Sequence, residues 1–150
     1  MLVYRITRTK YADGLQVSGR ENRWNRAKQY VIYASESKAL ATLEMVANRG
    51  AIMEGVLYKL LTIEISRPKE VLTLVGTQEL GDRWQNMPNW PTTQQIGSRW
   101  YIKKSSVALK VPSVLVDGEY NFAINTDHPD FEKCVTLKSV EDFHWDPRLL

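Results

Sequence analysis

The chain has 150 residues, a length that suits one domain whose core needs neither disulfide bonds nor a structural metal. Its 43% hydrophobic and 25% charged residues lie near the averages of soluble globular proteins, and no apolar run approaches the roughly 18 residues of a membrane span. The net charge of +3 and pI near 9.0 suit either nucleic acid or the phosphates of a small ligand. We expect one soluble domain over residues 1–150 without membrane contact.

The cysteine content and the first residues of the chain indicate the cellular compartment. Cys134 is the single cysteine, so no intramolecular disulfide is possible, and with two histidines it makes a poor set of metal ligands. The opening residues, MLVYRITRTK, lack the charged, apolar and small-residue order of a signal peptide. We therefore expect a cytoplasmic protein without a metal site.

Two strands and a helix are predicted in the first third of the chain. Apolar segments predict strands at residues 2–7 and 30–34. Ser35 and Ser37 are suited to cap a helix that ends before Gly50. Helical spacing predicts one buried face of this helix, formed by Ala39, Leu40, Leu43, Val46 and Ala47.

The remaining chain alternates strand and helix patterns. Residues 92–104 form the predicted second helix, and turn residues occur at 117–118 and 127–130. The predicted strands are residues 55–65, 71–75, 108–116, 120–125 and 134–139. We therefore predict a mixed α and β domain without an internal boundary.

Residue type and position suggest a few candidate site residues, because the strong sequence motifs of phosphate loops, dinucleotide folds and catalytic triads are absent. Arg23, Trp24 and Asn25 place a guanidinium, an indole and an amide together, a combination that suits phosphate and a flat heterocycle. An exposed loop anchored by Trp24 explains the same residues without a ligand.

Three further positions each allow a functional and a structural interpretation. Tyr33 ends a predicted strand before a helix, where open sheets expose ligand-binding groups, although strand tyrosines usually lie in the core. Glu44 lies at the edge of the predicted buried helix face, either partly buried or reaching solvent. Ser113, in an apolar run, needs a hydrogen-bond partner if it is buried.

Six fragments are spread along nearly the whole chain. They are VYRI at 3–6, RWN at 23–25, VIYASES-ALATLE at 31–44, QIGSRW at 95–100, VPSVLV at 111–116 and EYNFAIN-HPDF at 119–131. Together, and in this order, they resemble the RES family, which is named for its arginine, glutamate and serine. The family usually has glycine before the motif arginine, where this chain has Asn22, so Arg20 after Gly19 is an alternative to Arg23 as the motif arginine.

The resemblance implies an α+β fold of the ADP-ribosyltransferase type, a split β core flanked by helices with NAD+ in the cleft. It implies a toxin that cuts the nicotinamide–ribose bond of NAD+, with NAD+ as substrate and no cofactor. Glu44 would stabilise the developing positive charge on the ribose, while Arg23 would bind phosphate. Tyr33 would be the third catalytic residue beside these two. It would also shape the substrate pocket together with Trp24 and Asn25, and Ser113 would orient the nicotinamide side.

The resemblance leaves the acceptor undecided and implies a partner protein. Water, inorganic phosphate or a protein side chain could attack the ribose. An antitoxin of the Xre type, with a helix-turn-helix, is expected to block the cleft, and this chain itself is not expected to contact DNA. Two alternatives are a mono-ADP-ribosyltransferase acting on a cellular protein and a non-enzymatic RNA-binding toxin, which the basic pI suggests.

Overall fold

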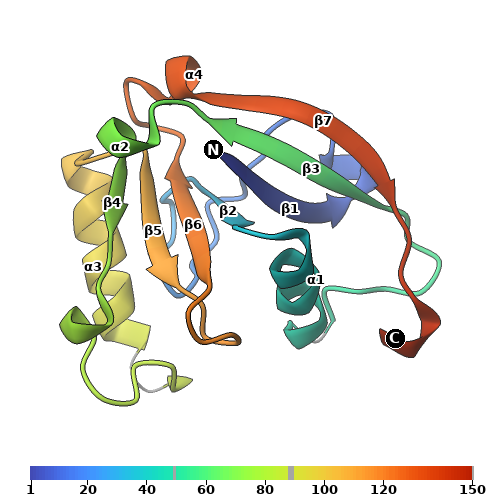
Figure 1. The fold of residues 1–150 in the computed structure, drawn as a ribbon, viewed down its shortest axis with the longest axis horizontal. Coiled ribbons are helices and arrows are strands. Elements are labelled where there is room, and N and C mark those ends of the chain that lie inside the picture. The colour runs from blue at the N-terminus through green and yellow to red at the C-terminus, as the bar shows by residue number, and fades with distance from the viewer. Residues whose placement is uncertain (49, 88–89, 150) are drawn as a thin grey trace.

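The computed structural model describes residues 1–48, 50–87 and 90–149, and in these residues seven strands form one mixed sheet (Figure 1). The sheet order is β4-β5-β6-β2-β1-β3-β7. The strands are β1 (Leu2–Arg8), β2 (Val31–Ser35), β3 (Tyr58–Ile65), β4 (Leu72–Leu74), β5 (Ala108–Pro112), β6 (Tyr120–Asn125) and β7 (Val135–Phe143). The helices are α1 (Lys38–Ala47), α2 (Pro68–Val71), α3 (Trp90–Lys103) and α4 (Phe131–Cys134). The predicted α+β class is confirmed.

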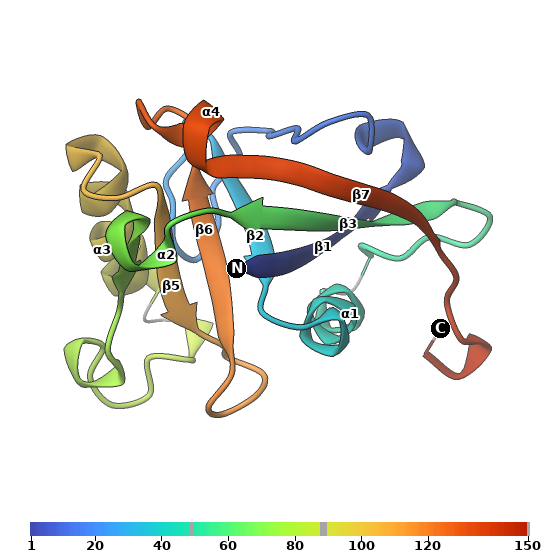
Figure 2. The same cartoon turned by 45° about the horizontal axis from the view of Figure 1, so that its top comes forward.

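The sheet is divided between β1 and β2. These neighbours share one register pair, Tyr4 with Ser35, whereas β1 pairs with β3 along its whole length. The four strands β4-β5-β6-β2 therefore form one half and β1-β3-β7 the other, and the two halves run in crossing directions (Figure 2). This is the split core that the sequence led us to expect.

The two halves pack face to face around the main hydrophobic cluster. Val3 and Ile63 meet Ile32, Phe122 and Ile124 there, and each of these side chains is at most 1% exposed. The other face of β5 and β6 packs against a second cluster that includes aromatic residues of α3. Strands β5 and β6 are consequently buried on both faces, whereas the edge strand β4 is largely exposed.

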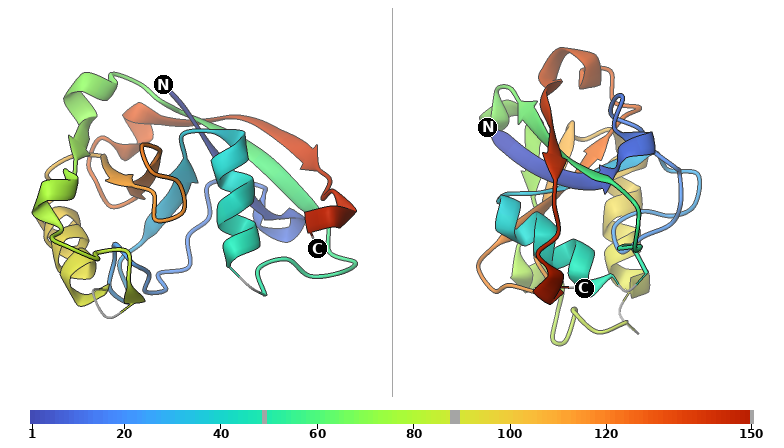
Figure 3. Two further views of the ribbon diagram at one scale, coloured as in Figure 1. Left: turned by 60° about the horizontal axis from the view of Figure 1, so that its bottom comes forward. Right: turned by 90° about the vertical axis from the view of Figure 1, so that its right-hand side faces the viewer.

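Helix α1 lies between the two halves in Figure 3 and begins as expected. The Ser37 hydroxyl oxygen accepts a hydrogen bond from the Leu40 backbone N–H at 3.0 Å, an N-cap that satisfies one free donor of the first turn. Leu40 and Ala41 are the buried residues of the helix. The sequence prediction of the buried face was therefore wrong for Ala39, Leu43 and Ala47, which are exposed.

The reason for that error is the position of the helix. α1 packs on β1 and β2 across the gap between the sheet halves, so it buries a narrower face than a helix lying flat on a continuous sheet. Because residues four apart share a helix face, Glu44 lies in line with Leu40, toward the gap.

Element boundaries differ from the predicted ones where hydrogen bonds end or extend a strand. β5 ends at Pro112 because the Ser113 hydroxyl oxygen accepts hydrogen bonds from the N–H groups of Leu115 and Val116, which closes a turn. β7 extends to Phe143 because it pairs with β3 as far as Tyr58, with one register shift between Thr62 and Ile63. Among the described residues, no helix is long and apolar enough to cross a lipid bilayer.

Candidate functional site

A cavity of about 710 Å³ opens where the two sheet halves separate. This volume is in the range of small-molecule sites. Its lining comes from β1, β2, α1, the loop that leads to β2, and the turn after β5. Of the predicted site residues, Arg23, Trp24, Tyr33 and Glu44 line it, whereas Asn25 and Ser113 do not.

Glu44 is half-buried and held by the sheet. Its Oε1 accepts a hydrogen bond from the Asn121 amide Nδ2 at 2.5 Å. The Oδ1 of the same amide accepts a hydrogen bond from the Ser35 hydroxyl at 2.7 Å. A carboxylate in the cavity is thus joined to β2 and β6 by a chain of two hydrogen bonds.

Arg23 brings a positive charge to the same cavity. Its guanidinium donates hydrogen bonds to the backbone oxygens of Trp84 (3.2 Å) and Gln85 (3.0 Å), and it lies 5.6 Å from the centre of the Trp90 ring. Partial burial lowers the pKa of the Arg23 guanidinium, and the negative charge of Glu44 opposes this shift. The two charges therefore influence each other across the cavity.

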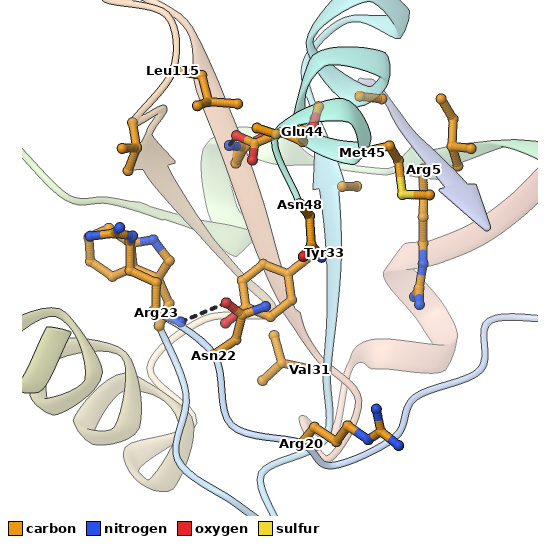
Figure 4. Close-up of a pocket in the computed structure, with 18 of the residues that line it drawn as sticks. Arg5, Arg20, Asn22, Arg23, Val31, Tyr33, Glu44, Met45, Asn48 and Leu115 are labelled. Carbon is orange, nitrogen blue, oxygen red and sulfur yellow. Dashed lines mark hydrogen bonds between the residues drawn. The ribbon is translucent and has the colours of Figure 1, made fainter. Parts of the chain in front are cut away.

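A second arginine, Arg5 on β1, lines the cavity and was not among the predicted site residues. Burial lowers the pKa of its guanidinium, and Nη1 donates a hydrogen bond to the Gln16 backbone oxygen at 3.1 Å. In the view of Figure 4, Glu44 and Tyr33 lie between Arg5 and Arg23. An arginine within the apolar strand segment VYRI was the sequence signal for it, since a charge is costly to bury without a purpose.

Arg20, the alternative motif arginine, also lines the cavity. Its side chain is exposed, and its backbone oxygen accepts a hydrogen bond from the Asn25 amide at 2.8 Å. Arg23 is the more buried of the two and is the one that interacts electrostatically with Glu44.

Tyr33 projects from β2 to the cavity and is fixed at its hydroxyl. The hydroxyl donates a hydrogen bond to the Asn25 side-chain oxygen at 2.6 Å. Burial raises the pKa of Tyr33 well above its usual value, so the phenol stays neutral near pH 7. The ring supplies an uncharged aromatic surface beside the cavity charges.

Asn25 is part of the loop structure and does not reach the cavity, contrary to the substrate-binding role expected for it. It is 1% exposed, and its amide nitrogen donates to the backbone oxygens of Arg20 and Arg26, at 2.8 and 2.9 Å, while its oxygen accepts from Tyr33. With both ends of the amide occupied inside the protein, Asn25 fixes the loop and the Tyr33 ring.

Ser113 and Trp24 likewise have structural surroundings. Ser113 is 5% exposed, and its hydroxyl closes the turn that carries Val114 and Leu115 to the cavity. Trp24 is 3% exposed, and its ring packs in the second hydrophobic cluster, with its centre 6.3 Å from that of Trp84. Trp24 thus lines the cavity from within this cluster, whereas Ser113 lies behind the turn and is not among the lining residues.

The arrangement has the chemical elements of a site for an anionic ligand. The guanidiniums of Arg5, Arg20 and Arg23 suit phosphate oxygens, which arginine binds through paired donors. The carboxylate of Glu44 is available to stabilise positive charge, and the neutral ring of Tyr33 lines the same cavity.

Comparisons with known proteins identify the family of this chain. The sequence model described as the RES domain matches residues 2–146. The chain belongs to the RES domain family. This confirms the resemblance drawn from the sequence fragments.

Curated relatives cover the RES domain almost from end to end. A protein named Toxin Res from Yersinia enterocolitica is 31% identical, with 99% of each chain aligned. A Toxin Res from Photorhabdus laumondii is 30% identical over 100% of this chain and 97% of the relative. A protein of a Sphingobium species named Prs ADP-ribosylating toxin is 33% identical over 95% of this chain and 91% of the relative.

Proposed function

We propose that this RES domain is a toxin that cleaves the nicotinamide–ribose bond of NAD+. The observation that carries the proposal is the Glu44 carboxylate in a cavity that also holds Arg5 and Arg23. The names of the relatives support the toxin role, and the name of the Sphingobium protein supports a reaction at this bond, because ADP-ribosylation breaks it.

In the proposed reaction the bond between the nicotinamide nitrogen and the ribose carbon breaks, and nicotinamide leaves with the electron pair. The ribose then carries positive charge that the carboxylate of Glu44 stabilises. Arg23 and Arg5 bind the pyrophosphate, and the neutral Tyr33 ring shapes the pocket beside the nicotinamide. NAD+ is the substrate, and no cofactor enters this scheme.

The acceptor completes the reaction by attacking the ribose carbon. Water would give ADP-ribose, inorganic phosphate would give its phosphorylated form, and a protein side chain would become ADP-ribosylated. The second candidate function is this last one, mono-ADP-ribosylation of a cellular protein, which the name of the Sphingobium relative favours. Both functions use the same bond cleavage and the same Glu44.

The test is NAD+ consumption by the purified protein and by cells that express it. Glu44→Gln should reduce the rate by about 100- to 1000-fold, because it removes a charge that acts on the transition state. Glu54→Gln is the matched control, since Glu54 is exposed and does not line the cavity. Wild-type toxicity with undiminished NAD+ would exclude NAD+ depletion and favour protein modification or RNA binding.

Labelled NAD+ separates the two candidate functions. Label transferred to one cellular protein indicates a mono-ADP-ribosyltransferase, whereas bulk NAD+ loss without labelled protein indicates hydrolysis or phosphorolysis. Repeating the assay with and without inorganic phosphate distinguishes the last two.

The proposed toxin needs an inhibitor in its own cell. We infer, from the family resemblance, an antitoxin of the Xre type that covers the cavity opening. Met87 and Leu115, which line the cavity and are 64% and 39% exposed, offer apolar surface at this place for such a partner. Co-expression of the antitoxin should restore growth and NAD+ levels, and replacing Met87 with Glu should weaken the rescue.

A further inference from the structure

We propose that Asn121 is a positioning residue for Glu44, and that Ser35 orients the Asn121 amide for this purpose. The inference deepens the proposed function and rests on it, because its readout is the reaction at Glu44. It is carried by the hydrogen-bond chain from Ser35 through Asn121 to Glu44, whose members come from β2, β6 and α1.

The amide of Asn121 has a fixed orientation. Ser35 and Asn121 are register partners on the antiparallel pair β2 and β6. The Ser35 hydroxyl donates to Oδ1 at 2.7 Å, so the opposite end of the amide, Nδ2, turns toward α1. Ser35 is 4% exposed, which protects this bond from competition with water.

The oriented amide then holds one oxygen of Glu44. Nδ2 donates to Oε1 at 2.5 Å, a hydrogen bond to a charged group and therefore stronger than one between neutral groups. In the described part of the chain, no hydrogen bond to Oε2 is found, so this oxygen is available for the substrate. Since α1 has few buried residues, the bond also fixes the carboxylate relative to the sheet.

Glutamate has three side-chain torsions, and without a partner the carboxylate would sample several rotamers over the cavity. A small displacement of a reacting group lowers the rate strongly, which is why catalytic groups are held by neighbours. Asn121 would therefore act mainly on kcat, whereas the affinity for NAD+ depends chiefly on the arginines.

The electrostatic surroundings of Glu44 determine how a substitution at Asn121 should behave. Arg23 is the charged group that interacts with Glu44 across the cavity. The other titratable side chains that line the cavity are Tyr4, Arg5, Arg20, Glu21 and Tyr33. A new carboxylate at position 121 would lie within hydrogen-bond distance of Glu44, so the two negative charges would repel each other directly.

The experiment compares steady-state NAD+ cleavage by wild type, Asn121→Leu, Asn121→Asp and Ser35→Ala. Asn121→Leu should lower kcat by about 10- to 100-fold while KM changes little, the loss expected for a hydrogen bond to a charged group. Asn121→Asp keeps the shape but sets two carboxylates together, and should move the acid limb of the pH–rate profile upward by about one unit or more. Ser35→Ala should lower kcat by a smaller factor.

Gln95→Glu is the matched control for an amide changed to a carboxylate, because Gln95 is exposed on α3 and does not line the cavity. It should leave kcat and the pH profile unchanged. Circular dichroism verifies that each variant is folded, and Asn121→Asp, which retains the volume of Asn121, serves if Asn121→Leu is unfolded.

The outcomes separate the inference from the function on which it rests. If wild type cleaves NAD+ but both Asn121 variants keep its kcat and pH profile, the positioning role is overturned and the function stands. A lower melting temperature with unchanged kinetics likewise overturns it, because that result describes a structural residue. If wild type cleaves no NAD+, the proposed function fails and the inference fails with it.

Discussion

The two halves of the sheet differ in how they are buried. In the four-strand half, β5 and β6 are covered on one face by the other half and on the opposite face by the cluster that includes α3. In the three-strand half, the edge strand β7 alternates between residues that face the core and residues that face solvent. The doubly covered half supplies Tyr33, Ser35 and Asn121, whereas the other half adds Tyr4, Arg5 and Ile6 to the cavity. The cavity thus lies where the more deeply buried half meets the more exposed one.

The largest expected effect on stability comes from the core of the four-strand half. Ile124 on β6 is 0% exposed, and Ile124→Ala should lower the free energy of unfolding by about 2–5 kcal/mol. Val140 on β7 is 41% exposed, so Val140→Ala should change it by no more than about 0.5 kcal/mol. Urea denaturation measures both, and equal losses would contradict the difference between the halves.

Helix α3 packs closely against the loop that carries Arg23, and a substitution at this contact should lower stability somewhat less than Ile124→Ala does. A Cβ on Gly97 would lie 1.8 Å from the Trp24 backbone oxygen, so Gly97→Ala must displace backbone and should cost about 1–3 kcal/mol. Alanine would otherwise favour the helix over glycine. At Gly14, in the loop after β1, a Cβ meets nothing within 4 Å, and Gly14→Ala should not destabilise the protein in thermal unfolding.

Removing the Tyr33 hydroxyl leaves the buried Asn25 oxygen without its donor. Tyr33→Phe should lower the free energy of unfolding by about 1–3 kcal/mol, the usual cost of an unsatisfied buried polar group. Tyr11, which follows β1 and is 44% exposed, provides the control, and Tyr11→Phe should have almost no effect. Unfolding of both variants in denaturant measures the change in stability. Their kcat and KM values show whether Tyr33 also acts on the substrate.

The free energy of unfolding should fall gradually at alkaline pH because of Tyr101 on α3, which packs against the four-strand half. Burial and the hydrogen bond to Asp127 raise the pKa of Tyr101 to about 12. The unfolded state ionises from a pH of about 10, so above that pH it binds fewer protons than the folded state and the free energy of unfolding falls until pH 12. In a plot of the free energy of unfolding against pH, Tyr101→Phe should therefore reduce the decline between pH 10 and pH 12.

In the three-strand half, stability should depend on acid pH through the ion pair between Lys59 and Asp142. The hydrogen bond and charge of Lys59 lower the pKa of Asp142, so the stability from this pair is lost as the pH falls through the folded-state pKa. Since the pair joins β3 to the edge strand β7 at an exposed position, Lys59→Met should change the acid limb of a stability–pH curve only slightly.

The order of the strands and of the two longer helices could be predicted from the sequence because strand and helix patterns are local, whereas the four-residue helices α2 and α4 were missed. The predicted strand at 120–125 agrees with β6, and Ser37 caps α1 as expected. The buried face of α1 could not be predicted, because it depends on the gap between the sheet halves that the helix spans. The boundary at Pro112 depends on a side-chain turn at Ser113 that an apolar run conceals.

For the site, residue types and family resemblance led to Glu44, Arg23 and Tyr33, which line one cavity. The same argument gave Asn25 and Ser113, whose polar groups are used inside the protein. Short polar side chains look alike in sequence whether they face a ligand or a backbone carbonyl. Asn121 was missed for the same reason, since its partner Glu44 is 77 residues away in the chain.

The sequence by itself determined the α+β class, the order of the strands and of the two longer helices, the RES family and the residue types of the candidate site. These follow from local patterns and from fragments in a fixed order. Only the tertiary structure decided which of those residues share a cavity, that Arg5 joins them, and that Asn121 holds Glu44. The physical reason is that burial and hydrogen-bond partners depend on distant segments, and the split between β1 and β2 sets where those segments meet.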